Sequence, residues 1–284
     1  MVVFPGLSTK GNPVSVRFWG TRGSIAAPGR STVRYGGNTS CLEVRYGKES
    51  LILDGGTGIR LFGQARNGSV DRNIRILVTH THMDHIAGLP FFGPALKNGQ
   101  PLDIYGPPGL KKALQNLFPF PVLTSHKRIH EIRTGTLRLP PFMVSTQWLN
   151  HPGKVLGYRI RVPSGRSVVY ISDHEPGDHF CHNREAITNG SLARWIAEPD
   201  LLVMDAQYFE AECHARRGWG HSSIAHTVHL ALESGAKKLV LFHHDPSHSD
   251  RILEQKLTQA RKFIHRSGKR LPCHLAREGW TLKF

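Results

Sequence analysis

The densest group of residues that could carry out chemistry lies in the segment Leu77–His85, which reads Leu-Val-Thr-His-Thr-His-Met-Asp-His. His80 and His82 are two positions apart, so their side chains face the same way where the backbone is extended. Asp84 and His85 follow at once. The simplest account is two metal ions, one held by His80 and His82 and one by Asp84 and His85. The alternative, a surface loop that is histidine-rich by chance, does not explain this spacing directly after an apolar run.

Polar residues also follow several other apolar runs. Asp54, Asp173, Asp205 and His243 each come after a short stretch of aliphatic or aromatic residues, as His80 does. In layered sheet folds, ligands bind at the carboxyl ends of the strands. These positions therefore predict that side chains from distant parts of the chain converge at one edge of a sheet.

The elements that must position these residues are mostly short strands. Apolar residues at helical spacing predict helices over Ser222–Ser234 and Arg251–Ser267, and a shorter one over Lys111–Leu117. The proline-containing segment Leu117–Leu149 predicts a long loop inserted over the active site. Many strands and few helices indicate an α/β or α+β layered fold. Runs rich in Val, Ile, Leu, Tyr and Phe predict strands over Val14–Phe18, Cys41–Arg45, Leu51–Asp54, Ile74–Thr79, Asp103–Tyr105, Tyr158–Val162, Ser167–Ser172, Leu201–Met204 and Lys238–Phe242.

The composition narrows the class of protein. The chain has 284 residues, of which 39% are hydrophobic, so we expect one folded domain over 1–284 rather than a largely disordered chain. No apolar run approaches the roughly 20 residues of a membrane helix. Four dispersed cysteines fit a reducing, cytoplasmic location. The formal charge of +16 favours an anionic partner, and the 18 histidines indicate metal chemistry.

The motif His80-Thr-His82-Met-Asp84-His85 resembles the His-x-His-x-Asp-His signature of the metallo-β-lactamase-fold hydrolases. The resemblance covers nearly the whole chain. It is closest to the phosphodiesterase branch, which includes the tRNA 3′-processing endonucleases. The other segments that carry the resemblance are Leu53–Gly58, His151 with Leu156–Ile160, Tyr170–Asp173, Gly220–Ser223 and Leu239–His243.

The resemblance implies an αββα sandwich that holds two divalent metal ions. The nucleophile would be a hydroxide between the ions. Zinc is the first candidate, with manganese or iron as alternatives, because the ligand set contains no thiolate. The resemblance assigns seven ligands: His80, His82 and His151 for one ion, Asp84, His85 and His243 for the other, and Asp173 as the bridge.

Residues beside the ligands also have expected roles. The resemblance makes His221 a proton donor to the leaving oxygen, and Asp205 stands where the endonuclease branch carries a glutamate. We therefore expect an Asp205–His221 proton shuttle, with Asp84 as a further catalytic residue. The alternative for His221 is a helix-capping role. Asp54 is expected to hold the ligand loop by hydrogen bonds, and the turn Thr21–Ser24 could cradle a phosphate.

The predicted function is hydrolysis of a phosphodiester in a cyclic or small nucleotide. Only 21 residues separate His151 from Asp173, which leaves no room for the tRNA-gripping arm that the endonucleases insert in this interval. Three alternatives stay open: a nuclease on RNA or DNA, an iron-dependent oxidoreductase or thioester hydrolase on the same fold, and a non-catalytic nucleic-acid-binding module. No membrane partner is expected, and the resembling branch makes a homodimer a reasonable expectation.

Overall fold

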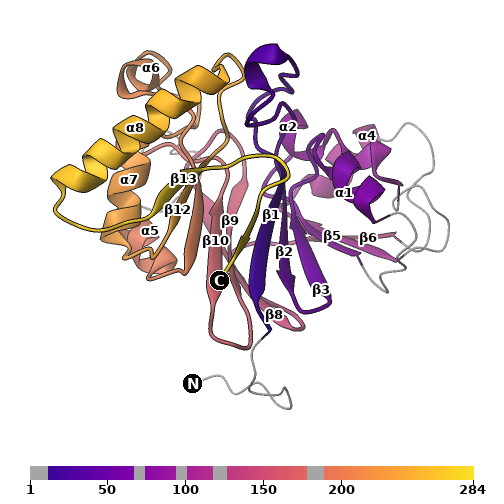
Figure 1. Cartoon of the computed structure of the whole chain (residues 1–284). Helices are drawn as coiled ribbons and strands as arrows, with labels where there is room; N and C mark the ends of the chain where they lie inside the picture. Colours follow the sequence, from indigo (N-terminus) through magenta and orange to yellow (C-terminus); the bar gives the residue numbers. More distant parts are fainter. Residues whose placement is uncertain (1–11, 67–73, 94–100, 118–126, 178–188) are drawn as a thin grey trace.

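The computed structural model describes residues 12–66, 74–93, 101–117, 127–177 and 189–284. Two seven-stranded sheets face each other in the middle of the molecule (Figure 1). The first sheet has the order β14-β1-β2-β3-β4-β5-β6. Its strands are β1 (Val14–Gly20), β2 (Cys41–Tyr46), β3 (Glu49–Leu53), β4 (Ile74–Leu77), β5 (Leu102–Gly106), β6 (Lys127–Glu131) and β14 (Thr281–Lys283).

The second sheet has the order β13-β12-β11-β10-β9-β8-β7. Its strands are β7 (Gly135–Leu139), β8 (Phe142–Leu149), β9 (Val155–Arg161), β10 (Ser167–Ile171), β11 (Leu201–Asp205), β12 (Leu239–Phe242) and β13 (Cys273–Leu275). Strands β10 and β11 are buried along their whole length, which is typical of parallel strands covered on both faces.

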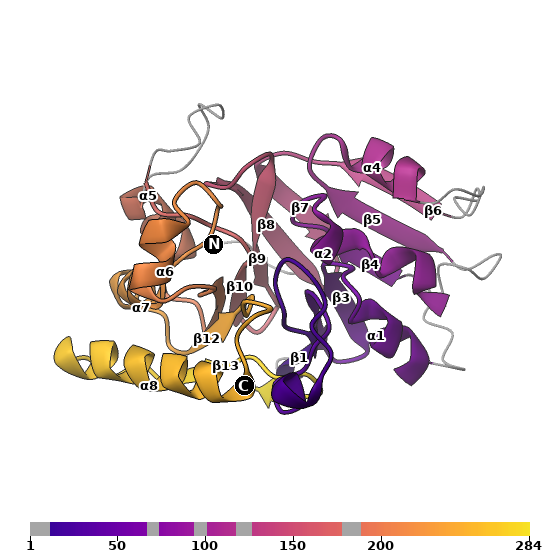
Figure 2. The same cartoon turned by 90° about the horizontal axis from the view of Figure 1, so that it is seen from above.

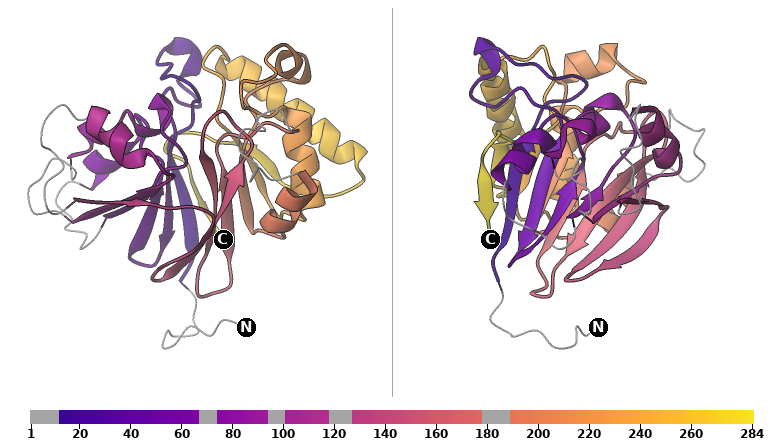
Figure 3. Two further views of the ribbon diagram at one scale, coloured as in Figure 1. Left: turned by 180° about the vertical axis from the view of Figure 1, so that it is seen from behind. Right: turned by 90° about the vertical axis from the view of Figure 1, so that its right-hand side faces the viewer.

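Helices lie on the outer face of each sheet. Seen from above and from behind, the helices stay outside and the sheets inside (Figures 2 and 3). The helices are α1 (Ile59–Ala65), α2 (Met83–Ile86), α4 (Leu110–Leu117), α5 (Asn189–Ile196), α6 (Glu210–Ala215), α7 (Ile224–Glu233) and α8 (Asp250–Arg266). The expected αββα sandwich is therefore confirmed. No helix in the described ranges combines the length and the apolar character needed to cross a bilayer.

Three apolar clusters hold the layers together. One lies between the sheets and includes Phe18 from the first and Trp148 from the second. The second packs α5, α7 and α8 against the second sheet, with Leu253 as an example from α8. The third packs α1 and α4 against the first sheet through residues such as Phe62. Burying one such side chain stabilises the fold by roughly 1.5–3 kcal/mol.

Each sheet has an antiparallel part and a parallel part. Strands β3 to β6 run parallel in the first sheet, and β10 to β13 run parallel in the second. The carboxyl ends of the parallel strands in each sheet therefore share one edge. The polar residues at or just after the ends of β3, β4, β10, β11 and β12 therefore lie at these edges.

The prediction of a long loop over Leu117–Leu149 is wrong for the described part of this segment. That part forms β6, β7 and β8, while residues 118–126 lie outside the described ranges. Strand β8 alternates buried and partly exposed residues, with Phe142, Val144, Thr146 and Trp148 on the buried face. Pro140 and Pro141 stand between β7 and β8, so they separate the two strands rather than exclude them.

Candidate metal centre

The central motif lies at the junction of β4 and α2. Strand β4 ends at Leu77, and the connecting segment between β4 and α2 carries His80 and His82. His82 has extended φ and ψ and directly precedes α2, so Asp84 and His85 lie in the first turn of that helix. The change from strand to helix separates the motif into two pairs of side chains.

His80, His82 and His151 form the first group, here called the imidazole group. Each offers a ring nitrogen, and these three atoms lie within 4.8 Å of one another. His151 follows β8 and brings its Nε2 to 3.3 Å from Nδ1 of His82. His80 and His151 are buried, whereas His82 is exposed.

Asp84, His85 and His243 form the second group, here called the carboxylate group, and all three are buried. Oδ2 of Asp84 lies 3.2 Å from Nε2 of His85 and 3.1 Å from Nε2 of His243. His243 follows β12 and faces the centre, whereas His244 turns away and bonds through Nε2 to the carbonyl of Ala276.

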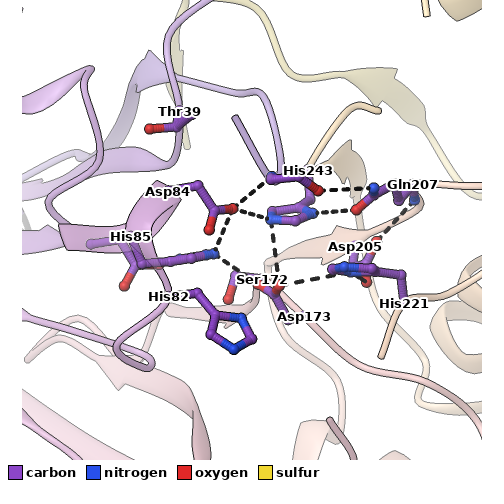
Figure 4. Close-up of polar contacts among 12 residues, drawn as sticks. Thr39, His82, Asp84, His85, Ser172, Asp173, Asp205, Gln207, His221 and His243 are labelled. Carbon is purple, nitrogen blue, oxygen red and sulfur yellow. Dashed lines mark hydrogen bonds and ion pairs between the residues drawn. The ribbon is translucent and has the colours of Figure 1, made fainter. Parts of the chain in front are cut away.

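Asp173, which follows β10, lies between the two groups. Its Oδ1 is 3.2 Å from Nε2 of His85, and its Oδ2 is 3.4 Å from Nε2 of His243. The same Oδ2 is 3.8 Å from Nε2 of His80 and 3.9 Å from Nε2 of His151. Figure 4 shows that the side chains of Asp173, His85 and His243 turn toward a common point. The structure thus brings together all seven residues that the sequence proposes as ligands.

The donor atoms of this cluster fit a metal centre. Nε2 of His80, Nε2 of His85 and Oδ1 of Asp173 are buried but form no hydrogen bond of ordinary geometry with the described residues. Buried polar atoms of this kind are costly unless a partner satisfies them. Imidazole nitrogens and carboxylate oxygens suit Zn²⁺, Mn²⁺ or Fe²⁺, so the residues present fit the expected cations.

Burial controls protonation in the imidazole group. It lowers the pKa of His80 well below its usual range, lowers the pKa of His82, and lowers the pKa of His151 to about 3. All three rings are therefore neutral near pH 7, the form in which imidazole binds metals.

The carboxylate group behaves in the opposite way. Burial alone would lower the pKa of His85 and of His243, but Asp84 and Asp173 outweigh burial and raise both values. Burial alone would raise the pKa of each carboxyl group, but the neighbouring imidazoles hold both well below the usual range. Protonated imidazoles therefore balance the negative charges of the carboxylates in this group.

Hydrogen bonds on the outer side of the ligands fix the rings. Oδ2 of Asp54 lies 2.9 Å from Nδ1 of His85 and also accepts from the hydroxyl of Tyr170 at 2.7 Å. Asp54 therefore holds the ligand loop as expected. Oε1 of Gln207 lies 2.8 Å from Nδ1 of His243. Such partners orient the imidazole and tune its basicity.

The turn Thr21–Ser24 serves a ligand. The backbone N–H of Ser24 donates to Oδ2 of Asp84 at 2.7 Å, and a Cβ on Gly23 would lie 2.3 Å from the His243 ring. Only glycine leaves room for the ring at that position. The turn was expected to bind a phosphate. It instead contacts two candidate ligands, since the N–H of Ser24 is bonded to Asp84 and Gly23 packs against the His243 ring.

His221 and Asp205 form the expected pair. Nδ1 of His221 lies 3.1 Å from Oδ2 of Asp205 and 3.7 Å from Oδ2 of Asp173. His221 lies three residues before α7, whose N-terminus is capped by the side chain of Ser223 and not by His221. The geometry therefore gives the alternative capping role to Ser223.

Two residues beside the centre were not identified from the sequence. Gln207 holds His243, and the buried Glu175 accepts hydrogen bonds from the backbone N–H groups of Gly218 and Gly220. Glu175 follows the predicted strand Ser167–Ser172, and Gln207 follows the predicted strand Leu201–Met204. Both residues stand two positions after another candidate residue, Asp173 or Asp205. This position is the sequence feature by which they could have been predicted.

Comparisons with known proteins agree with this geometry. A model of the beta-lactamase superfamily domain matches residues 51–244. A ribonuclease Z from Nocardia farcinica is 24% identical over 270 residues, and the alignment covers 80% of this chain and 86% of that protein.

Two solved structures show the same fold. The metallo-beta-lactamase fold protein YhfI from Bacillus subtilis superposes with a TM-score of 0.74 at 22% identity, covering 96% of this chain and 100% of that one. A diphosphatase of the PhnP family superposes with a TM-score of 0.71 at 18% identity, covering 96% of this chain and 98% of that one.

Proposed function

The chain belongs to the beta-lactamase superfamily, and we propose that it is a metal-dependent phosphodiesterase that cleaves a cyclic or small nucleotide. One observation carries the proposal: a cluster of metal-binding groups lies beside a histidine that is paired with a buried carboxylate. The relatives support a phosphate substrate, because one is named a ribonuclease and one neighbour is described as a diphosphatase.

We assign the ligands by group. The imidazole group would hold one cation, the carboxylate group would hold the other, and Asp173 would contact both. When bound, the two cations, zinc in the first place and manganese or iron as alternatives, supply Lewis acidity to a phosphoryl oxygen and lower the pKa of a water nucleophile. Asp84 would also have a catalytic role, in which its carboxylate orients the attacking water. The backbone N–H of Ser24 holds Oδ2 of Asp84 in place at 2.7 Å.

His221 would protonate the leaving oxygen. Asp205 accepts the hydrogen bond from Nδ1 of His221, which fixes the ring so that Nε2 can carry the donated proton. The proton on Nε2 can then pass to the oxygen when its bond to phosphorus breaks. Proton donation of this kind contributes about 10²–10⁴-fold to the rate.

Two features support a small nucleotide as the substrate. The interval between His151 and Asp173 is filled by the hairpin of β9 and β10, so it has no room for a long RNA-binding arm. Three exposed apolar side chains lie next in sequence to residues of the centre: Ile25 (65% exposed) and Trp219 (62%) in loops, and Met83 (59%) at the start of α2. Apolar and aromatic side chains are suitable partners for a nucleobase.

A nuclease is the second candidate, and α8 is the observation in its favour. From Gln255 to Arg270 the chain has no Asp or Glu, and Arg261, Lys262 and Arg266 are exposed. A basic surface of this kind suits a polynucleotide backbone.

A substrate panel on the zinc-loaded protein tests the proposal. We expect turnover of bis-p-nitrophenyl phosphate and of a cyclic nucleotide, and no turnover by Asp84→Asn. Faster cleavage of a single-stranded RNA than of either small diester would favour the nuclease. Turnover of a thioester alone, or stoichiometric redox-active iron in a protein that cleaves no diester, would contradict the phosphodiesterase.

A further inference from the structure

Glu175 is a buried carboxylate that has no role in the mechanism above. It lies two residues after Asp173, and 3% of its surface is exposed. Gly218 donates its N–H toward both carboxylate oxygens, at 2.8 and 3.0 Å, and Gly220 donates to Oε2 at 2.7 Å. Backbone N–H groups of one loop therefore hold both carboxylate oxygens of Glu175.

The loop that Glu175 holds fixes His151. The carbonyl of Gly220 lies 2.7 Å from Nδ1 of His151, so it accepts that N–H and leaves Nε2 for the centre. Gly220 has φ of +90°, and a Cβ there would lie 2.0 Å from the same nitrogen. The loop and the ring are thus in direct contact.

The same loop leads into His221. The next residue, Ser222, donates its N–H to Oδ2 of Asp205 at 3.1 Å, the atom that also accepts from His221. The Ser222 hydroxyl donates to the carbonyl of His174, directly before Glu175. The backbone N–H of Glu175 donates at 2.8 Å to the carbonyl of Asn150, the residue before His151.

We propose that Glu175 is a positioning residue that sets His151 for metal binding and His221 for proton transfer through the Gly218–Gly220 loop. This inference rests on the proposed function for the role of His221. Its part in metal binding does not depend on the substrate. One carboxylate therefore links a candidate ligand of the imidazole group to the proposed proton donor.

The chemistry of the side chain explains why a carboxylate is needed. A carboxylate only accepts hydrogen bonds, and bonds to a charged acceptor are about twice as strong as neutral ones. A glutamine at this position keeps the shape but directs an NH₂ group at one of the loop N–H groups. Glu175→Gln should therefore loosen the loop while the residue still fills its space.

Glu131 offers a matched control. Its Oε1 accepts from the backbone N–H groups of Gly109 at 3.0 Å and Lys111 at 3.1 Å, so it also holds a glycine-containing loop. Glu131 lies at the exposed end of β6, and its hydrogen bonds among the described residues go to Gly109 and Lys111, neither of which is a candidate ligand. The variants Glu175→Gln and Glu131→Gln are to be compared with the full-length wild type by thermal unfolding, cobalt titration of the metal-free protein, and diester hydrolysis.

We expect Glu175→Gln to weaken the binding of one cobalt ion about 10–100-fold and to change the visible spectrum of the cobalt protein. Its loss of activity should be larger for a diester with an alkoxide leaving group than for bis-p-nitrophenyl phosphate, because only the former needs the proton of His221. Glu131→Gln should retain wild-type affinity, spectrum and leaving-group preference.

Three results would overturn the inference. They are wild-type cobalt affinity in folded Glu175→Gln, an unchanged leaving-group preference, or equal losses in the two variants. If the variant does not fold, Glu175→Asp, which keeps the charge on a shorter side chain, must give a weaker form of the same changes. If the wild type cleaves no diester, the proposed function fails, while the cobalt titration still decides the metal-binding part.

Discussion

The imidazole group and the carboxylate group lie side by side but solve opposite electrostatic problems. In the imidazole group, burial lowers each pKa, so three neutral rings surround one point. In the carboxylate group, buried Asp84 lies 3.2 and 3.1 Å from two imidazoles whose pKa it raises. The first group is ready for a cation, whereas the second already holds positive charge in the form of protons.

This difference indicates how well each group would keep its geometry in the absence of metal. The carboxylate group keeps its geometry because its members form ion pairs with one another. The imidazole group has no internal counter-charge, and Nε2 of buried His80 lacks a hydrogen-bond partner among the described residues. A bound cation would therefore replace protons in the carboxylate group, and in the imidazole group it would supply the missing partner of Nε2 of His80.

The largest effect is expected from Asp84→Asn. The change removes the charge of the carboxylate group and the counter-charge that raises the pKa of His85 and His243. We expect loss of one bound ion and a fall in kcat of about 10⁴-fold or more, since a catalytic cation supplies several kcal/mol of transition-state stabilisation. Metal content and diester hydrolysis measure both.

His82→Ala is the companion variant for this comparison, because it changes the exposed member of the imidazole group. It should lower the metal content of the other half of the centre and leave the ion pair of Asp84 and His243 in place. If both variants lost both ions equally, the two groups would be one cooperative site and the comparison would be wrong.

A smaller effect is expected from His221→Ala, which leaves both groups complete. We expect kcat to fall about 10²–10³-fold for a diester with an alkoxide leaving group, and less for bis-p-nitrophenyl phosphate. Asp205→Asn should give a weaker form of the same pattern, because it keeps the hydrogen bond to Nδ1 but removes the charge. Loss of metal in His221→Ala would instead identify His221 as a ligand.

The structure brings the seven candidate ligands close together, as the sequence predicted, and His80, Asp173 and His243 among them follow apolar runs. The spacing of His80 and His82 is local information, and a strand end places Asp173 or His243 at the edge of a sheet without any knowledge of the partner strand. The αββα fold came from the family resemblance. The helices over α7 and α8 were predicted to within two residues, since their apolar spacing is regular.

Other parts could not be predicted for physical reasons. Gln207 acts on His243 across 36 residues, and Glu175 acts on Gly220 across 45, so neither contact leaves a local pattern. Strand β8 alternates between a buried and a partly exposed face, but the neighbouring prolines led to the prediction of a loop. The loop prediction overestimated the effect of Pro140 and Pro141, because these residues lie between β7 and β8 and not inside either strand.

The pH dependence of metal binding sharpens the comparison further. His85 and His243 have a raised pKa, so a cation must displace protons from the carboxylate group, and its affinity should fall by up to about tenfold per pH unit for each proton displaced as the pH decreases. The pKa of His151 is lowered to about 3, so the imidazole group should release almost no protons between pH 6 and 8. Zinc titrations by calorimetry in buffers of different ionisation enthalpy count these protons, and equal proton release at the two steps would contradict the distinction.

The smallest effect is expected from the outer partner of His243. Gln207 offers His243 a neutral amide oxygen at 2.8 Å, whereas Asp54 offers His85 a charged one at 2.9 Å. A neutral hydrogen bond contributes about 1 kcal/mol, so Gln207→Leu should weaken zinc binding about fivefold. Asp54→Asn should weaken it about tenfold or more, because bonds to charged acceptors are about twice as strong. Gln207 contacts only His243 among the candidate ligands, so zinc affinity measured at the imidazole group is the internal control for Gln207→Leu. Asp54 also accepts from Thr79, whose Oγ1 lies 3.1 Å from Nδ1 of His80, so Asp54→Asn is expected to affect both groups. A larger effect of Gln207→Leu than of Asp54→Asn would mean that packing around His243, rather than the charge of its hydrogen-bond partner, sets the affinity of that half of the centre.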